Sequence, residues 1–289
     1  MQYEGDVYRP PSEASSLIVQ AAIGCAHNDC TFCSMFKGKR FRVRAEDEVI
    51  RDFRAARAAY REVRRIFLAD GDVLALSNER LLRLLGEIGE LFPECERVSF
   101  YGSPQDVLRK TPEELAALRE HGAGFVYLGA ESGSGRVLEN VRKGATRNEI
   151  IAAIKKIEAA GLISSVTFIS GLGGRELSEE HAIETGRLIS EAEPSYASLL
   201  TLLLDPAAPM YEDVRAGRFS FLPPREIAAE TLLMLEHTEI EKDCVFRSNH
   251  ASNYISLKGT LPRDKARMMD ELRAALKAGG FKDERFRLL

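Results

Sequence analysis

The stretch Gly24-Cys25-Ala26-His27-Asn28-Asp29-Cys30-Thr31-Phe32-Cys33 holds three of the chain's five cysteines, at the spacing C-x4-C-x2-C. It follows the apolar residues 17–22, which predict a buried strand, so the cysteines are expected on a loop. Three thiolates on such a loop can converge on one metal centre. An electron-transfer cluster usually takes four cysteines, whereas three leave one iron open to another ligand. The alternative is a structural zinc site with His27 as the fourth ligand.

This stretch resembles the cluster loop of radical S-adenosylmethionine (radical SAM) enzymes, which follows C-x3-C-x2-C with an aromatic residue before the last cysteine. Phe32 takes the aromatic position, and one extra residue separates the first two cysteines. The resemblance implies a 4Fe–4S cluster held by Cys25, Cys30 and Cys33, with S-adenosylmethionine on the remaining iron. It also implies reductive cleavage of S-adenosylmethionine to a 5′-deoxyadenosyl radical that abstracts hydrogen from the substrate. Such a cluster is expected to be oxygen-sensitive, because an iron without a thiolate is open to attack.

Strand and helix patterns alternate from residue 17 to residue 204. Short apolar runs predict strands at residues 17–22, 65–69, 98–101, 125–128, 166–169 and 196–204, and helical spacing of apolar residues predicts a helix after each of the first five. Short, continuously apolar strands separated by helices indicate an α/β fold with a covered parallel sheet. An open doubly wound sheet and a barrel both fit. The resemblance favours a partial (β/α)6 TIM-like barrel.

Two domains are expected from this pattern. Residues 1–204 form the barrel core, preceded by an irregular arm at residues 1–16. Beyond residue 204 the alternation stops, and several prolines interrupt the chain. Residues 205–289 are therefore predicted to be a helical and irregular extension, with helices at 225–237 and 263–278, that closes the barrel and lines the substrate pocket.

In parallel β/α arrays, ligands bind at the carboxyl ends of the strands. Asp70-Gly71-Asp72 follows the strand at 65–69, where the family has a Gly-Gly-acidic turn that meets the amino group of the methionine moiety. Asp70 replaces the first glycine of that turn. Ser103, after the next strand, is a weaker candidate for a polar contact with the cofactor. A tight turn capped by Asp72 explains the same residues without a ligand.

The segment Leu128-Gly129-Ala130-Glu131-Ser132-Gly133 closely resembles a segment of methylthiotransferase-like and coproporphyrinogen-dehydrogenase-like radical enzymes. The resemblance implies that Glu131, with Ser132 beside it, holds the ribose hydroxyls and that Lys143 pairs with the methionine carboxylate. Both contacts are chemically sound, because a carboxylate can bind a diol and a cation a carboxylate. Thr167 stands where some relatives place a ribose-binding Asp, before a glycine turn that resembles the family's adenine turn. Solvated loops and a plain glycine turn are the alternatives.

The polar stretch at residues 243–254 stands between two predicted helices. A packed core would not tolerate this polar density unpaired, so the stretch is predicted to line the substrate pocket. Cys244 and Tyr254 are predicted as catalytic donors of a hydrogen atom to a product radical. A plain surface loop is the alternative. The predicted substrate-binding residues are Arg247, Asn249, His250 and Asn253.

Composition restricts the function further. The chain has 289 residues, is 45% hydrophobic and 29% charged, and carries a net charge of −4, which argues against a general nucleic-acid binder. There is no run of about 18 apolar residues that predicts a membrane span. Residues 1–6 lack the basic and apolar regions of a signal peptide, and clustered cysteines fit a reduced compartment. We therefore expect a cytoplasmic protein.

The substrate predicted from these observations is a small polar or anionic molecule, and the reductant is an electron donor such as flavodoxin or ferredoxin. The basic residues 37–44 beside the cysteine loop are candidates for meeting either of them, although such charge runs are usually solvated. No membrane partner is expected, and nucleic acid is disfavoured. The alternatives are a radical SAM enzyme that modifies RNA or protein, and a non-catalytic iron–sulfur or zinc-binding protein.

Overall fold

The computed structural model describes residues 3–287, so residues 1–2 of the predicted N-terminal arm and the last two residues of the predicted C-terminal extension lie outside the described range. The chain divides into two compact units. Strands β6 (Ala123–Glu131) and β7 (Ile163–Ser170) and helix α6 (Arg147–Ala159) contain residues of both units. The first unit comprises Met1–Asn28, Met35–Leu128 and Lys156–Ser164, and the second comprises Asp29–Ser34, Gly129–Lys155 and Ser165–Leu289.

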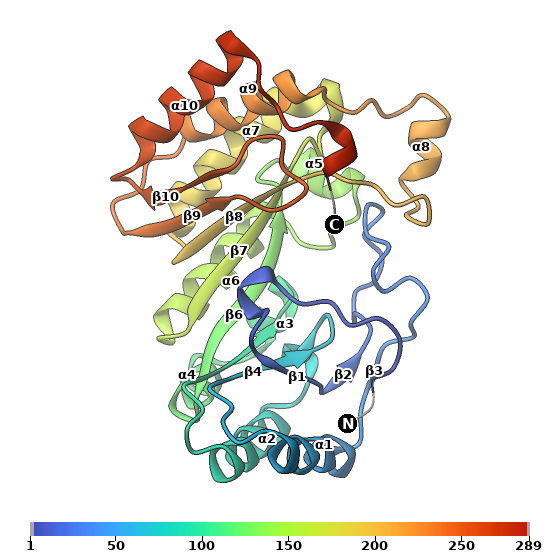
Figure 1. Ribbon diagram of the computed structural model, residues 1–289, viewed down its shortest axis with the longest axis vertical. Helices are drawn as coiled ribbons and strands as arrows, with labels where there is room; N and C mark the ends of the chain where they lie inside the picture. Colours follow the sequence, from blue (N-terminus) through green and yellow to red (C-terminus); the bar gives the residue numbers. More distant parts are fainter. Residues whose placement is uncertain (1–2, 288–289) are drawn as a thin grey trace. The chain divides into compact units, whose positions relative to one another are not determined.

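The first unit is built on a parallel sheet. Its strands pair in the order β1 (Leu17–Gln20), β4 (Arg65–Ala69), β5 (Arg97–Tyr101) and β6. Ile66, Phe67 and Leu68 of β4 are all fully buried, as a continuously apolar strand predicts when both faces of its sheet are covered. Helices α1 (Glu46–Ala59) and α2 (Asn78–Leu91) lie side by side below these strands (Figure 1).

Shorter elements complete the first unit. The predicted strand at 17–22 divides into β1 and β2 (Ala22–Ile23), and β2 pairs in antiparallel fashion with β3 (Arg42–Val43). Helix α4 (Pro112–Glu120) starts as its sequence predicts, because Thr111 and Glu114 form a capping box around a proline in the first turn. The remaining elements are η1 (Pro11–Glu13), η2 (Val73–Ala75) and α3 (Pro104–Arg109).

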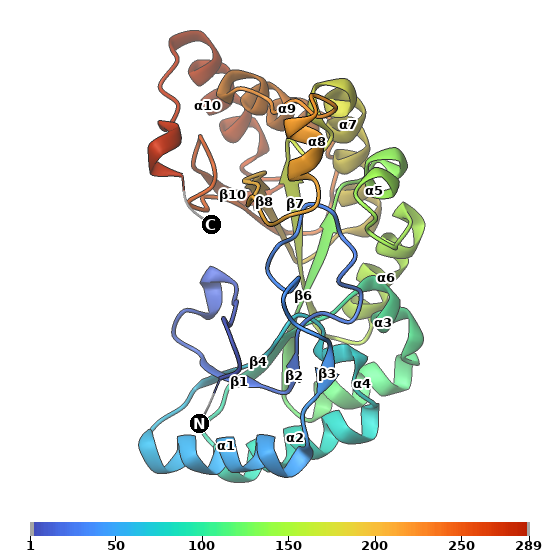
Figure 2. The same ribbon diagram turned by 90° about the vertical axis from the view of Figure 1, so that its right-hand side faces the viewer.

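The second unit continues the α/β pattern. Strands β7, β8 (Tyr196–Thr201) and β9 (Cys244–Ser248) are parallel, and β10 (Leu257–Leu261) is antiparallel to β9. Helices α7 (Gly174–Ala192), α9 (Pro224–Glu236) and α10 (Lys265–Ala278) lie side by side over these strands (Figures 1 and 2). The shorter elements are α5 (Gly135–Asn140), α8 (Tyr211–Arg215) and η3 (Glu284–Phe286).

The α/β class and the strand–helix alternation predicted from the sequence are confirmed. The predicted helices at 225–237 and 263–278 correspond to α9 and α10. The structure adds β9 and β10 to the segment that the sequence predicts as helical and irregular, because β9 finds its hydrogen-bonding partner in β8, far along the chain. Among the described residues, no helix is both long and apolar enough to cross a membrane.

Candidate active site

The cysteine loop begins at a tightly held glycine in the first unit. Gly24 has a φ of +77°, its N–H donates to Asp70 Oδ2 at 3.0 Å, and its carbonyl accepts from the Gly71 N–H at 3.1 Å. Cys25 follows directly and is half-buried. The start of the loop is therefore fixed by the turn after β4.

Asp70 is the anchor of this region. Its side chain is fully buried and forms an ion pair with Lys39 at 3.1 Å. It also accepts hydrogen bonds from the Gln20 amide at 3.2 Å and from Gly24. The resemblance predicted Asp70 as a cofactor-binding residue in place of a glycine, and that contact stays a prediction. In the structure, Asp70 joins β1, the start of the cysteine loop and Lys39.

Gly71 lies where the loop comes closest to the turn after β4. A Cβ atom added there would stand 2.7 Å from the ring of Phe36 and 3.1 Å from Cβ of Cys25. Real Cβ atoms essentially never approach another atom so closely, so the glycine is needed for this packing. The turn is thus shaped to receive Cys25.

Asp72 behaves differently from Asp70. It is buried, and its Oδ1 accepts from the Ser103 N–H at 3.3 Å, but its Oδ2 has no hydrogen-bond partner. Burial, reinforced by the neighbouring Asp106, holds the pKa of Asp72 well above its usual range. A buried acceptor without a partner is costly, and a bound donor such as an ammonium group would satisfy it. Ser103, also predicted as a cofactor contact, caps α3 by accepting from the Asp106 N–H.

Phe32, Cys30 and Cys33 belong to the second unit. Phe32 packs against a hydrophobic cluster that includes Val137, Val141 and Leu202. The adjacent Thr31 is held on both sides, because its N–H donates to Val141 O at 3.0 Å and its carbonyl accepts from Met210 N at 2.8 Å. Cys30 and Cys33 are half-buried. This part of the loop is therefore fastened to α5 and to the segment before α8.

Glu131 and Lys143 come together at the carboxyl end of β6. Lys143 Nζ lies 2.9 Å from Glu131 Oε1, and both side chains are largely shielded from solvent. Glu131 has a φ of +66°, an uncommon conformation that occurs at functional sites. Gly129 makes room for the carboxylate, since a Cβ there would stand 2.0 Å from Oε1. Two residues assigned separately from the sequence thus form one polar pair.

Ser132 lies beside this pair in a buried hydrogen-bonded network. Its hydroxyl is 2.8 Å from Nδ1 of His181, and it accepts from the Ser134 N–H at 3.0 Å. Burial lowers the pKa of His181 to about 4, while a hydrogen bond to the Ile169 carbonyl opposes this shift. Nε2 of His181 lies 3.8 Å from Glu230 Oε1. Neither His181 nor Glu230 was identified from the sequence, because their importance arises only from tertiary contacts.

Glu230, on α9, extends this hydrogen-bonded network to the glycine turn after β7. It accepts from the Gly171 N–H at 2.7 Å and from the Ser178 hydroxyl at 2.6 Å. Burial raises the pKa of Glu230 to about 7. Thr167 lies on β7, half-buried, on the same face as Ile169, which packs with Phe32 on the hydrophobic cluster.

The residues predicted around the substrate do not all lie together. Asn253 is buried and saturated, with bonds to Thr201 Oγ1, Leu199 O and Ser248 Oγ. Cys244 is fully buried in β9. The side chains of Asn253 and Cys244 are therefore enclosed by other residues of the protein, whereas Tyr254 lines a cavity.

The other three occupy different positions around β9. Arg247 is exposed on the strand and donates to the Phe246 and Gly259 carbonyls. Asn249 is exposed. His250 Nδ1 contacts the Ser252 hydroxyl at 2.9 Å, and burial lowers the pKa of His250. None of the three is among the residues that line this cavity.

The basic stretch beside the cysteine loop is largely engaged within the protein. Lys39 pairs with Asp70, Arg42 with Glu4, and Arg44 with Asp52. Lys37 donates to the Asn28 carbonyl at 2.6 Å. Lys39 and Arg44 are largely shielded from solvent in these pairs, whereas the Arg42–Glu4 pair is exposed.

The donor set of the loop is three cysteine thiols, which are the ligands that iron–sulfur clusters take. Within residues 3–287, no group of three His, Cys, Asp or Glu side chains is close enough to hold one metal ion. The three loop cysteines are half-buried and form no disulfide.

Comparison with known proteins identifies relatives of the same type. The family model of the radical SAM superfamily matches residues 20–189. A putative methylthiotransferase of Methanocaldococcus jannaschii is 26% identical over 170 residues, which cover 57% of this chain and 37% of that protein. A tRNA-2-methylthio-N(6)-dimethylallyladenosine synthase of Prosthecochloris aestuarii is 28% identical over 224 residues, 75% of this chain and 47% of that protein. This chain thus spans less than half the length of either relative.

The fold comparison agrees. Coproporphyrinogen III oxidase of Escherichia coli, described as a radical SAM enzyme, has a TM-score of 0.56 and 18% identity. The match covers 76% of this chain and 52% of that protein. At this identity the likeness concerns the fold alone, and it confirms the TIM-like barrel class expected from the sequence.

Proposed function

This chain belongs to the radical SAM superfamily, and we propose that Cys25, Cys30 and Cys33 hold its cluster while Asp72, Glu131 and Lys143 hold S-adenosylmethionine. Members of this superfamily are enzymes that bind a 4Fe–4S cluster and S-adenosylmethionine. When bound, these groups supply the one-electron chemistry that generates a hydrogen-abstracting radical. The protein contributes ligation, orientation and exclusion of solvent.

The Glu131–Lys143 pair at 2.9 Å is the observation that carries the proposal. A ribose diol can bind to the Glu131 carboxylate and a methionine carboxylate to the Lys143 ammonium, so each partner exchanges its ion pair for a ligand contact. Asp72 Oδ2, buried without a partner, accepts the cofactor's ammonium group. Phe32 packs beside the cofactor, with weaker contacts assigned to Gly71 and Thr167, while Ser132 supports the neighbouring Glu131 from its buried hydrogen-bonded network.

The substrate proposed is a small polar or anionic molecule, and the reductant is an electron donor of the flavodoxin or ferredoxin type in the cytoplasm. The alternative is a radical SAM enzyme that modifies RNA, which is favoured by the similarity to the tRNA-modifying synthase of Prosthecochloris aestuarii. The net charge of −4 and the internal pairing of the basic stretch speak for the small molecule. We keep Tyr254 as the proposed hydrogen-atom donor because it lines a cavity.

Anaerobic reconstitution with iron and sulfide tests the proposal. The dithionite-reduced protein is expected to give an EPR signal that shifts on addition of S-adenosylmethionine, with formation of 5′-deoxyadenosine. Cys30→Ser is expected to abolish the cluster signal. Cys95→Ser is the matched control, because Cys95 lies outside the loop and its thiol donates to the Arg97 carbonyl. Equal loss of signal in both variants, or one tightly bound zinc ion in place of iron, would contradict the proposal.

Lys143→Met separates binding of S-adenosylmethionine from binding of the cluster. This variant is expected to keep the EPR signal of the cluster and to bind S-adenosylmethionine about 10- to 100-fold more weakly, which is typical for loss of a partly buried charged contact. The shift of the EPR signal, titrated with S-adenosylmethionine, measures this affinity. An unchanged titration would remove Lys143 from the cofactor site.

A further inference from the structure

The second unit contains a cavity of about 510 Å³ at the carboxyl ends of β7 and β8. This volume lies within the range of about 300–1,000 Å³ that is typical of small-molecule sites. Gly171, after β7, and Leu202, Leu203 and Leu204, after β8, form one side. Further lining residues come from the chain between α8 and α9, from the starts of these two helices, and from the C-terminal region around η3.

Most of the lining is apolar. Besides the three leucines that follow β8, the cavity is bounded by Phe221 and Ile227. Phe221 is 42% exposed, although exposing a large aromatic ring to water is unfavourable. An apolar cavity with an exposed aromatic side chain at its edge favours a ligand with an apolar or aromatic body.

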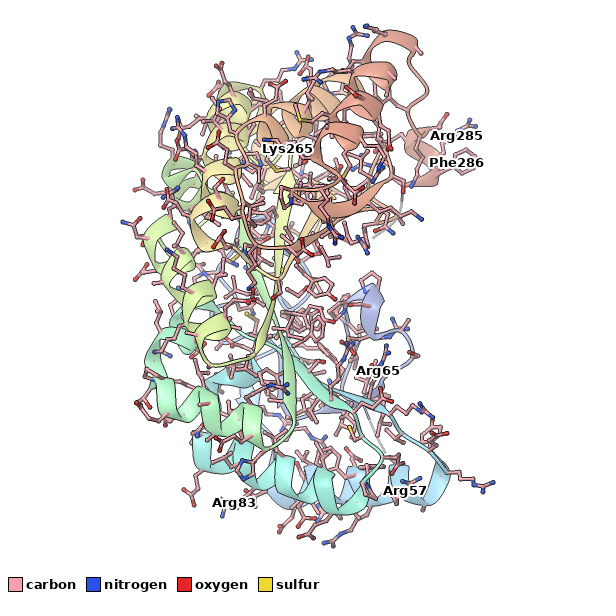
Figure 3. The ribbon with its side chains drawn as sticks, turned by 90° about the vertical axis from the view of Figure 1, so that its left-hand side faces the viewer. Arg57, Arg65, Arg83, Lys265, Arg285 and Phe286 are labelled. Atoms are coloured by element: carbon pink, nitrogen blue, oxygen red, sulfur yellow. The ribbon has the colours of Figure 1, made fainter. Side chains whose placement is uncertain are left out.

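A polar cluster occupies one wall. The guanidinium of Arg287, itself buried, stands 4.2 Å from the Tyr254 ring centroid and donates to the Tyr254 hydroxyl at 2.6 Å. Tyr254 in turn donates to Glu284 at 2.5 Å. Burial and the Glu284 contact raise the pKa of Tyr254 to about 12, so its hydroxyl stays protonated. Phe286 and Arg285, on the same short helix as Glu284, project away from the fold (Figure 3).

The other charged group in the lining is Arg175, in the first turn of α7. Its side chain is 59% exposed and pairs with Glu226 at 3.3 Å. The lining holds two arginines and one glutamate, and Glu226, the partner of Arg175, is not among the lining residues. Helices α7 and α9 both begin beside the cavity without a side-chain cap, and the positive ends of their dipoles favour an anion there.

We infer that this cavity binds the substrate, and that the substrate is a small organic anion with an apolar or aromatic body. The inference rests on the proposed function and gives its substrate a chemical class. The body of the substrate packs against the leucines after β8 and Phe221, while its anionic group faces Arg175. From the polar stretch at residues 243–254, predicted from the sequence to line the substrate pocket, Tyr254 lines this cavity, whereas Arg247, Asn249, His250 and Asn253 do not.

Two fluorescent probes test the chemical class on the full chain. 8-Anilinonaphthalene-1-sulfonate is an aromatic anion, and N-phenyl-1-naphthylamine has nearly the same body without the charge. Both are expected to bind wild-type protein with one-to-one stoichiometry. Leu203→Trp fills the cavity and is expected to weaken both probes at least about tenfold, whereas Leu203→Met conserves side-chain volume and is expected to change little.

Arg175→Ala tests the anion contact. This variant is expected to weaken the anionic probe about three- to tenfold and to leave the neutral probe unchanged, as for loss of one partly exposed charge. Arg187→Ala is the matched control, because Arg187 is on the same helix, is similarly exposed, and pairs with Glu184 outside the cavity. Far-ultraviolet circular dichroism verifies folding of each variant.

Each other outcome overturns the inference. If Leu203→Trp binds both probes as tightly as wild-type protein does, the probes bind outside this cavity. If Arg175→Ala and Arg187→Ala weaken the anionic probe equally, the cavity has no specific contact for an anion. Displacement of the probes by S-adenosylmethionine assigns the cavity to the cofactor, and displacement by unfractionated tRNA assigns it to RNA. Formation of 5′-deoxyadenosine by the reconstituted wild-type protein is measured separately, so that failure of the proposed function is distinguished from failure of this inference.

Discussion

The turn after β4 in the first unit and the turn after β6 in the second are each organised around one anchored residue and one neighbour suited to a ligand. After β4, the anchor is Asp70, held by the charge of Lys39, and the neighbour is Asp72. After β6, the anchor is Ser132, held by neutral His181, and the neighbour is Glu131. One turn is anchored by an ion pair and the other by neutral hydrogen bonds.

This difference separates structural polar groups from ligand-binding ones. A buried group whose partners all come from the protein has little left to offer a ligand, and breaking its contacts costs stability. A buried group with an unsatisfied atom gains when a ligand arrives. The comparison therefore predicts which substitutions should affect folding and which should affect binding.

The largest expected effect comes from removing the charged anchor. Asp70→Ala leaves Lys39 largely buried without its partner and removes an acceptor from Gly24 and Gln20. Loss of one member of a buried ion pair typically costs about 3–5 kcal/mol of unfolding free energy. Urea unfolding of the apoprotein is the measurement.

Two variants control this experiment. Asp243→Ala breaks an exposed pair with Arg263 and is expected to cost less than about 1 kcal/mol. Lys39→Met combined with Asp70→Leu removes both buried charges and should recover part of the lost stability. A loss at Asp70 no larger than that at Asp243 would refute the anchoring role.

The neutral anchor should instead be visible in the pH dependence of stability. The pKa of His181 falls from 6.5 to about 4 on folding, so its contribution is complete above about pH 6.5 and is lost as the pH falls toward 4. The pKa of Glu230 rises from 4.5 to about 7, so its contribution is complete below about pH 4.5 and is lost as the pH rises through 7. Each of these two contributions to unfolding free energy amounts to about 3 kcal/mol. They change in opposite directions as the pH rises, so they largely cancel in the wild-type protein.

Single substitutions should expose the two opposing slopes. Glu230→Gln keeps the His181 contribution, so unfolding free energy should rise between about pH 4.5 and 6.5. His181→Asn keeps the Glu230 contribution, so the unfolding free energy of this variant should fall as the pH rises over a similar range. Glu226→Gln, an exposed position on the same helix as Glu230, should retain the shallow wild-type profile. Parallel profiles for Glu230→Gln and His181→Asn would contradict the assignment.

The sequence predicts the repeating part of the fold well, because continuously apolar strands such as 65–69 alternate with amphipathic helices. It misses β9, whose alternating sequence Cys-Val-Phe-Arg-Ser becomes a strand only through pairing with β8. The same limit applies to the site. The strand-end position of Glu131 is visible in the sequence, whereas the burial of Asn253 depends on partners 52 and 54 residues away. Contacts at such separations leave no local pattern to read.

The smallest effect on stability, and the sharpest test of the comparison, is expected at Asp72. Asp72→Asn keeps the shape of the side chain and removes an acidic group whose charged form is disfavoured by burial and by Asp106. Because Oδ2 has no partner to lose, unfolding free energy measured below the ordinary Asp pKa of 3.8, where this carboxyl is protonated in the folded and the unfolded chain, should change by less than about 1 kcal/mol. Binding of S-adenosylmethionine to the reconstituted protein should nevertheless weaken about tenfold, since the amide offers less to an ammonium group than a carboxylate does.

Asp106→Asn is the matched control for Asp72, because Asp106 is also buried but is engaged by Ser103 and Arg109. This variant should lose stability without a comparable loss of cofactor affinity. If Asp72→Asn destabilised the fold while binding S-adenosylmethionine normally, Asp72 would be an anchor like Asp70. The unsatisfied oxygen would then not mark a ligand site, and the assignment of the turn after β4 to the cofactor would have to be withdrawn.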